Sequence, residues 1–228
     1  NGAGSSNEDG TINTTATSAN TTAGFSLVTY VGNGTSGATV GHGLGVVPNM
    51  IIVKNRDQAD AWQVYHSGNT AAPETDYLVL NTTAASVDNV NRWNDTAPTS
   101  SVFSLGNAVE VNTNTENYVA YCFADVEGYS KFGSYVGNGS TTLGPFISTG
   151  FRPAYVFLKN TVTAVRSWWV FDSARSPGNT ILTYITVDGS GAEGATTASA
   201  GSVNLFSNGF SVTGIGSSTI NSTVNNVY

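Results

Sequence analysis

The sequence predicts an all-β protein made of two tandem, homologous antiparallel β-sandwich modules. The first observation behind this prediction is an internal repeat: the sequence YVGNG at residues 30–34 recurs 105 positions later, at residues 135–139. The second is a series of short apolar runs separated by turns every ~8–12 residues, with almost no helical periodicity. A β-helix is the alternative architecture, but it would need a much shorter period, and none is visible.

The second copy follows the first at an offset of 105 residues with no gap. The apolar run at residues 50–53 maps onto residues 155–158, and every residue of the run changes while its apolar character is kept. Identical residues at matched positions are Gly45 and Gly150, Pro48 and Pro153, Lys54 and Lys159, and Asn55 and Asn160. The period is the size of a domain, which favours two modules over a solenoid.

Residues 1–23 are expected to be a linker or an extended N-terminal arm. They contain Gly, Ser, Asn and Thr with one large apolar residue, Ile12. Such a segment cannot bury enough apolar surface to fold alone. If it is ordered, another module or a sister chain must hold it.

The first β-sandwich repeat is predicted to cover residues 24–127. Alternation from Phe25 through Leu27 to Tyr30 predicts its first strand. Glycine-rich turns follow in residues 32–34 and 41–45, since glycine and asparagine tolerate positive φ. Further strands are predicted at residues 49–54, 62–66, 77–80, 101–105 and 117–124, with one helical turn within 86–93.

The second β-sandwich repeat, residues 128–228, is predicted to follow the same order. Matching at the 105-residue offset sets residues 145–147 against 40–42, and residues 205–209 loosely mirror residues 103–106. The second copy stops at Val227-Tyr228, where the first copy continues through Phe123. The sequence also lacks an initiator Met. We therefore expect a last strand truncated at the C-terminus and a chain cut from a longer protein.

Composition narrows the class of partner. Charged residues are 10% of the chain, against about 25% in an average globular protein. The eight Lys and Arg residues are scattered and the net charge is −7, which disfavours nucleic acid as a partner. No apolar run reaches the roughly 18 residues that cross a bilayer, so we expect no membrane insertion. The single cysteine, Cys122, excludes a disulfide within the chain.

The sequence makes no positive case for catalysis, a cofactor or a metal. It has no nucleophile elbow, zincin histidine pair or phosphate-cradling loop. His42 lies between two glycines, as a ligand or base could, but Ile147 stands at the matched position of the second copy. Calcium could bind in two Asn/Asp-rich loops: Asn55, Asp57 and Asp60, or Asp88, Asn89, Asn91 and Asp95. Asx turns that satisfy the local backbone are the preferred interpretation of both loops.

Tryptophans are the candidate contacts for a glycan or a protein partner, together with His42. Trp62 recurs as Trp168-Trp169 in the second copy, which favours a core anchor. Because adjacent residues of a strand point to opposite faces, one tryptophan of the pair must point outward. We expect that outward tryptophan to make a contact, and Trp93 is a further candidate.

Four stretches carry a resemblance to a known family. They are residues 18–30 (SANTTAGFSLVTY), 41–45 (GHGLG), 93–103 (WNDTAPTSSVF) and 121–135 (YCFADVEGYSKFGSY). Together they resemble a domain of unknown function that recurs in tail-fibre-like and other virion-associated proteins of tailed phages, particularly marine and cyanobacterial ones. The resemblance covers nearly the whole chain from about residue 17 and brings no established catalytic residues.

The resemblance implies a non-enzymatic structural and adhesive module of a phage fibre, located on the virion and therefore extracellular. Such a module would form a homo-oligomer, a trimer or a filament, and contact a host-surface glycan or protein. In the alternative, the subunit self-assembles into a filament by strand addition from residues 1–23. A glycan-degrading tailspike is disfavoured, because no carboxylate pair stands in a supportive context.

Overall fold

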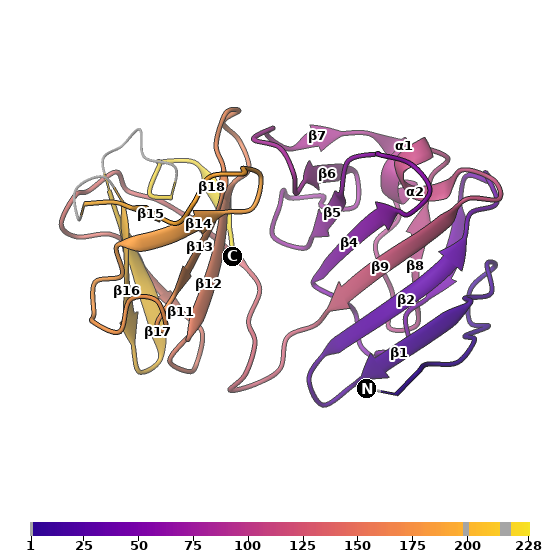
Figure 1. Ribbon diagram of the computed structural model, residues 1–228, viewed down its shortest axis with the longest axis horizontal. Helices are drawn as coiled ribbons and strands as arrows, with labels where there is room; N and C mark the ends of the chain where they lie inside the picture. Colours follow the sequence, from indigo (N-terminus) through magenta and orange to yellow (C-terminus); the bar gives the residue numbers. More distant parts are fainter. Residues whose placement is uncertain (1, 198–200, 215–219) are drawn as a thin grey trace. The chain divides into compact units, whose positions relative to one another are not determined.

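The computed structural model describes residues 2–197, 201–214 and 220–228, and its regular secondary structure is almost entirely β-strand (Figure 1). The prediction of an all-β protein is confirmed. The described helices, α1 (Val90–Trp93) and α2 (Val109–Asn112), have four residues each. The chain divides into two compact units. Unit 1 comprises the described residues of 1–79 and 86–126, and unit 2 those of 80–85 and 127–228.

Unit 1 contains a seven-stranded antiparallel sheet and a two-stranded sheet. The large sheet has the order β1-β2-β9-β4-β5-β6-β7, and β3 pairs with β8 in the small one. The strands are β1 (Ala16–Asn20), β2 (Phe25–Val31), β3 (Ala38–Gly41), β4 (Met50–Asn55), β5 (Gln63–His66), β6 (Asp76–Val79), β7 (Val87–Asp88), β8 (Val102–Leu105) and β9 (Asn117–Phe123).

The core of unit 1 lies between these two sheets, which gives a sandwich-like arrangement. Alternate residues of the central strands face inward, as the period of two requires. The large sheet contributes Val28, Tyr30, Ile51, Val53, Tyr118, Ala120 and Cys122 to the core, and the small sheet contributes Ala38, Val40, Phe103 and Leu105.

The N-terminal segment is held by its own unit and is not a separate linker. Ser5 pairs with Thr17, so that residues 5–17 form a closed loop. At its tip, the backbone N–H of Ile12 donates to Thr39 O at 2.9 Å. The Ile12 side chain is 6% exposed and belongs to the core of unit 1. The pairing of β1 with β2 and the burial of Ile12 against β3 together hold the segment.

Unit 2 contains a six-stranded sheet of order β10-β18-β12-β13-β14-β15 and a three-stranded sheet of order β11-β17-β16. Its core includes Ile147, Leu158, Phe171, Phe210 and Val212. The strands are β10 (Ser134–Val136), β11 (Phe146–Ser148), β12 (Tyr155–Asn160), β13 (Trp168–Asp172), β14 (Thr183–Thr186), β15 (Gly194–Ala195), β16 (Ser202–Phe206), β17 (Gly209–Thr213) and β18 (Asn225–Val227).

Strand pairing corrects part of the sequence matching. Residues 205–209 were matched to 103–106, but they span the end of β16 and its turn into β17. The strand that pairs with β11 is β17, in which Phe210 lies opposite Ile147. In unit 1, Phe103 lies opposite Val40. Unit 2 thus has an additional strand, β16, beside the strand that corresponds in pairing to β8.

Candidate functional site

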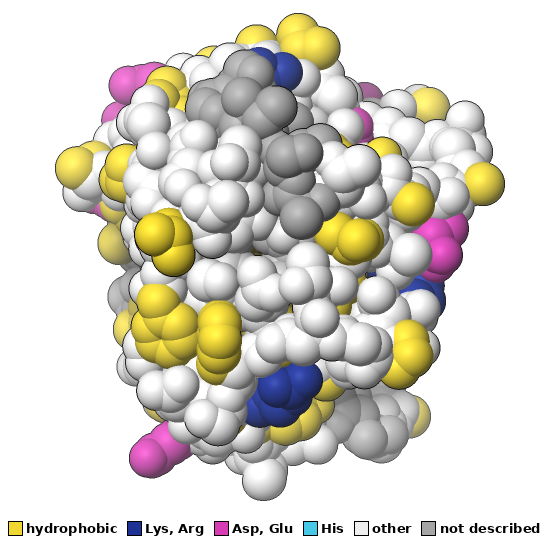
Figure 2. Space-filling view, turned by 90° about the vertical axis from the view of Figure 1, so that its left-hand side faces the viewer, with side chains coloured by type: hydrophobic (Ala, Val, Ile, Leu, Met, Phe, Trp, Pro, Cys, Tyr) yellow, Lys and Arg dark blue, Asp and Glu magenta, His cyan; other side chains and the backbone are white. Residues whose placement is uncertain are grey.

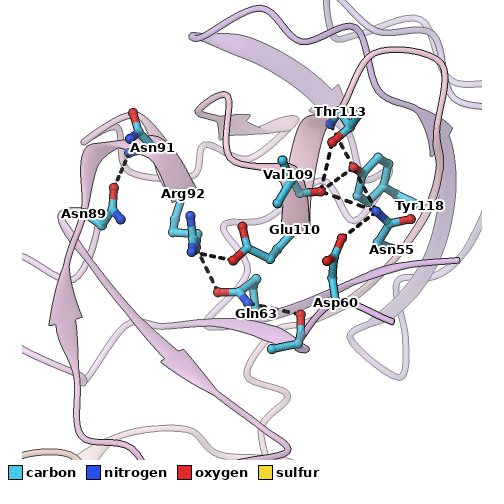
Figure 3. Close-up of polar contacts among 11 residues, drawn as sticks. Asn55, Asp60, Gln63, Asn89, Asn91, Arg92, Val109, Glu110, Thr113 and Tyr118 are labelled. Carbon is cyan, nitrogen blue, oxygen red and sulfur yellow. Dashed lines mark hydrogen bonds and ion pairs between the residues drawn. The ribbon is translucent and has the colours of Figure 1, made fainter. Parts of the chain in front are cut away.

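A cluster of polar side chains surrounds Asn55 at the end of β4. Asn55 is buried, and its Oδ1 accepts hydrogen bonds from the backbone N–H groups of Asp57 (3.0 Å) and Gln58 (3.3 Å). Its amide nitrogen faces Asp60 and Tyr118 (Figure 3). This nitrogen donates to Asp60 Oδ2 at 2.8 Å and to Glu116 Oε2 at 2.6 Å. Asn55 therefore closes a turn and holds two carboxylates at once.

The carboxylates of this loop are engaged by protein donors. Asp57 Oδ2 accepts from the backbone N–H (2.7 Å) and the side-chain amide (2.9 Å) of Asn117. These bonds stabilise the ionised carboxylate and lower the pKa of Asp57. Among the residues that the structure describes, no group of three or more His, Cys, Asp or Glu side chains is arranged to hold a metal ion. The loop is an Asx turn that is hydrogen-bonded to the start of β9 through Asp57 and Asn117.

The second Asn/Asp-rich loop contains a helix cap. Asn89 is the N-cap of α1, and its side-chain oxygen accepts from the Asn91 backbone N–H at 2.9 Å (Figure 3). Asn94 and Asp95 follow α1 with φ angles of 55° and 45°. Asn and Asp tolerate this left-handed conformation better than most residues. The composition of this loop is thus explained by helix capping and the turn.

Arg92 of α1 contacts three other elements in the interior of unit 1. Its guanidinium donates to Gln63 Oε1 at 3.0 Å and forms an ion pair with Glu110 at 2.8 Å (Figure 3). It also lies 4.6 Å from the centre of the Tyr77 ring. A buried guanidinium is tolerated when its donors are paired in this way. Arg92 links α1 to β5, β6 and α2, so these contacts give it a structural role.

The two units contain matching networks built on a buried asparagine. Asn112 Oδ1 accepts from the Asn33 backbone N–H at 2.9 Å, and its amide nitrogen donates to the carbonyls of Thr35 (2.9 Å) and Gly106 (3.0 Å). In unit 2, Asn221 bonds in the same way to Asn138 N (3.0 Å), Ser140 O (2.9 Å) and Gly214 O (3.3 Å).

A buried tyrosine accompanies each of these networks. The Tyr30 hydroxyl donates to Val111 O at 2.7 Å, and the Tyr135 hydroxyl donates to Ile220 O at 2.5 Å. Burial raises the pKa of both phenols. The bonded carbonyl belongs in each case to the residue before the buried asparagine. These polar residues hold turns in place and are inaccessible to a substrate.

His42 is 0% exposed, which corrects its candidacy as a contact residue. Its Nε2 lies 3.1 Å from Thr99 O, and its Nδ1 accepts from the Leu44 backbone N–H at 3.2 Å. Burial lowers the pKa of His42 from its usual value. The side chain fastens a bend and offers no surface to a glycan or a partner.

The tryptophans also lie differently from the expectation. Trp168 faces away from the core of unit 2, as alternation predicted, but it is 1% exposed and stacks on Phe157 at 4.9 Å. Trp169 packs against the core through Tyr184, with ring centres 4.0 Å apart. Trp93 is buried. The prediction of an exposed outward tryptophan was therefore wrong, and Trp62 is half-buried against Tyr121.

An exposed aromatic pair lies elsewhere, on the outer face of the three-stranded sheet of unit 2. Phe146 of β11 is 50% exposed and Phe206 of β16 is 41% exposed, with ring centres 5.7 Å apart. Between them, Gly209 of β17 has no side chain, so that the Phe146 ring lies across it. At the edge, Arg152 Nη1 donates to Leu205 O at 2.9 Å.

Sequence reasoning missed this pair, although a signal was present. Ile147 is buried in the core, so its neighbours Phe146 and Ser148 must point outward. The neutral polar residues Ser148, Asn204 and Ser211 share the face, and Ser207 and Asn208 form the turn between β16 and β17. The surface shown in Figure 2 is likewise mostly neutral: polar side chains and backbone (white) dominate that view, and charged groups are sparse.

The Cys122 thiol and the Lys159 amine are both buried in the interior of their units. Burial raises the pKa of the Cys122 thiol, which disfavours a reactive thiolate. Lys159 is buried and donates from Nζ to Arg166 O at 2.5 Å. Burial lowers the pKa of Lys159 to about 8, while the nearby charge of Asp188 acts in the opposite direction. Neither group lies beside a base or an oxyanion site in the described contacts.

Comparison with known proteins gives a family and no function. A family model described as a domain of unknown function (DUF7483) matches residues 1–228. No curated protein and no solved structure matches the chain. Within the described residues, no helix has the length and apolar character needed to span a membrane.

Proposed function

The chain belongs to the DUF7483 family, and we propose that it is a non-enzymatic structural and adhesive module of a phage virion fibre or appendage. The observation that carries the adhesive part is the exposed pair Phe146 and Phe206, set among neutral hydrogen-bonding side chains. The resemblance of residues 18–30, 41–45, 93–103 and 121–135 to fibre-associated domains supports the location on a virion.

We also propose that the two units are copies of one ancestral sandwich module. Support comes from hydrogen bonds that recur at matched places, above all those of Asn112 and Asn221. Asn55 and Asn160 form a second matched pair, because each Oδ1 accepts from the backbone N–H groups two and three residues later. The presence of asparagine at all four positions is explained by this role, since each buried side-chain amide satisfies backbone groups of the turn beside it.

The proposed duplication needs a change in register between the turns. His42 follows β3, and its backbone N–H donates to Ser101 O, just before the paired strand β8. Thr149 follows β11, and its backbone N–H donates to Asn208 O, just before the paired strand β17. The offset at this place is therefore 107, so Thr149 and not Ile147 matches His42. The second copy has two more residues between its first turn and β11, and two fewer before Pro153.

A glycan is the ligand class that this surface favours. The apolar C–H face of a sugar ring packs on aromatic side chains, and its hydroxyls need neutral donors and acceptors, which Asn204, Asn208 and Ser148 can offer. Charged groups, which a polyanion or nucleic acid would require, are scarce over the chain.

Binding of the intact chain to an array of bacterial surface polysaccharides tests this proposal. We expect binding that falls at least tenfold in Phe146→Ala/Phe206→Ala, with circular dichroism unchanged. Tyr129→Ala is the matched control, because Tyr129 is also an exposed aromatic residue of unit 2 but lies outside the three-stranded sheet. Equal binding by the double variant and the unaltered chain would overturn the assignment of this face.

The filament alternative rests on strand addition by residues 1–23. In the structure this segment closes on itself through Ser5 and Thr17 and buries Ile12 in its own unit. Donation to a neighbour would have to break those contacts first. Electron microscopy of concentrated protein separates the two candidates: long polymers that disappear on deletion of residues 2–14 would favour the filament.

A further inference from the structure

The bend at residues 41–45 is fixed on one side by a buried histidine. The His42 ring is fully buried, and both of its nitrogens are within hydrogen-bonding distance of backbone groups. Its Nδ1 accepts a hydrogen bond from the backbone N–H of Leu44 within the bend, and its Nε2 faces the carbonyl of Thr99 in the segment that precedes β8. The backbone N–H of His42 donates to Ser101 O at 3.1 Å.

These contacts define the protonation state of the ring. Since the Leu44 N–H is a donor, Nδ1 must carry a lone pair. The proton is then on Nε2, where it is donated to Thr99 O. The ring is neutral, with every polar atom used. Gain of a second proton would place N–H against N–H at Nδ1 and leave a buried cation.

The charged group that acts on this ring is Asp9, in the loop 5–17. Its carboxylate favours the protonated ring, but burial acts more strongly in the other direction. Asp9 is itself exposed and accepts from the Asn7 side chain at 3.0 Å. Asp9 is thus a solvated charge, and His42 has no direct ion pair among the described contacts.

On its other side, the bend touches the N-terminal segment through glycines. A Cβ on Gly41 would lie 1.8 Å from Asn7 Oδ1, and a Cβ on Gly43 would lie 3.2 Å from the Thr17 side chain. Gly43 has a φ of +67°, which favours glycine. The bend is therefore packed between the segment 99–101 and the segment 5–19, and a shift in it must disturb both.

We propose that His42 makes this bend a pH-sensitive joint. Proton uptake breaks the hydrogen bond from Leu44 to Nδ1, so the bend loosens from residues 99–101 and from the N-terminal segment. The joint does not depend on the proposed adhesive function, since it lies in unit 1 and uses none of the exposed aromatic residues.

Hydrogen exchange of the whole chain between pH 7 and pH 5, corrected for intrinsic exchange, tests the joint. This range lies above the ordinary titration of carboxylates. We expect the exchange protection of the peptides covering 41–45 and 98–102 to fall at least tenfold at pH 5, while protection of β12–β13 stays constant. His42→Asn is the non-titrating variant: its Oδ1 can accept from Leu44 but gains no proton, so its protection should not change with pH.

The chain has two histidines, so His66→Gln is the matched control that leaves His42 as the only one. It should keep the pH response. If His42→Asn does not fold, ¹⁵N NMR of the histidine rings in the unaltered chain decides: at pH 7, Nδ1 of His42 should be the unprotonated nitrogen. Protection independent of pH, or a proton on Nδ1 at pH 7, would overturn the proposal.

Discussion

Asn112 and Asn33 are 79 positions apart, yet the Asn33 backbone N–H donates to Asn112 Oδ1 at 2.9 Å. This bond fastens the turn after β2 to the end of α2. Asn221 and Asn138 stand in the same relationship in unit 2, at 3.0 Å. Buried asparagines therefore hold turns in both units, and we expect substitutions at these asparagines to lower the free energy of unfolding.

Asn112→Ala is expected to destabilise unit 1 by about 2–4 kcal/mol, because three backbone groups, of which the Gly106 carbonyl is buried, lose their partner. Asn221→Ala should do the same to unit 2. Urea unfolding followed by tryptophan fluorescence measures both effects. The exposed Asn114→Ala is the control and should change the free energy of unfolding by less than about 0.5 kcal/mol.

Arg92→Leu is expected to cost about 3–5 kcal/mol, since it leaves the Glu110 carboxylate without its cation and Gln63 without its donor. Adding Glu110→Gln to this variant should recover part of the loss. A double-mutant cycle measured by chemical unfolding gives the coupling. Additive effects of the two substitutions would show that the buried pair is not coupled.

Lys159 is expected to contribute more to stability as pH rises above about 8, and the difference between the unaltered chain and Lys159→Met isolates this contribution. Its pKa is about 8 in the folded chain and about 10.4 when unfolded. The unfolded state then binds more protons at Lys159 between these values, so the contribution of Lys159 to the free energy of unfolding rises with pH in this range and is smallest below about 8, while the raised pKa values of Cys122 and the buried tyrosines act in the opposite direction. Lys159→Met should remove this rise, whereas Lys54→Met, at the matched half-buried position, should keep it. An identical pH profile for Lys159→Met and the unaltered chain would contradict the prediction.

Ile12→Ala is expected to destabilise unit 1 by about 2–4 kcal/mol, the usual cost of truncating a buried aliphatic side chain. Leu143→Ala removes a similar side chain from an exposed turn and is the control. Thermal unfolding compares them. A flexible linker, in contrast, would tolerate both substitutions equally.

Trp168→Ala is expected to cost about 3–5 kcal/mol in stability and to leave glycan binding per folded molecule unchanged. Trp168 is buried against Phe157 and offers no surface. Isothermal titration with the best ligand from the array measures the affinity. A loss of affinity without a loss of stability would restore the tryptophan as a contact residue.

Alternation from Phe25 through Leu27 to Tyr30 predicted a strand where β2 lies, but the apolar residues that β2 buries are Val28 and Tyr30, and Leu27 is 36% exposed. Alternation could not predict the position of Ile12, since the loop 5–17 is set by close backbone approach: a Cβ on Gly10 would lie 2.4 Å from Thr39 O. Such contacts leave no periodic pattern in a sequence.

The candidate site was predicted less well for a related reason. Alternation gives the face on which Trp168 lies but not what covers that face. The sequence alignment of the two copies matched Phe146 to Gly41, so its exposed position was not predicted. The pairing of Ile147 with Phe210 in the structure corrects this alignment. The helix α2 has four residues, too few for a helical period to appear.

The proposed role as a fibre module is tested most directly by the mass of the chain in solution. Light scattering across a hundredfold dilution series measures it. A fibre module should give a discrete oligomer, a trimer, that persists on dilution and binds glycan through Phe146 and Phe206. A chain that is monomeric at every concentration and binds no glycan would contradict the proposal.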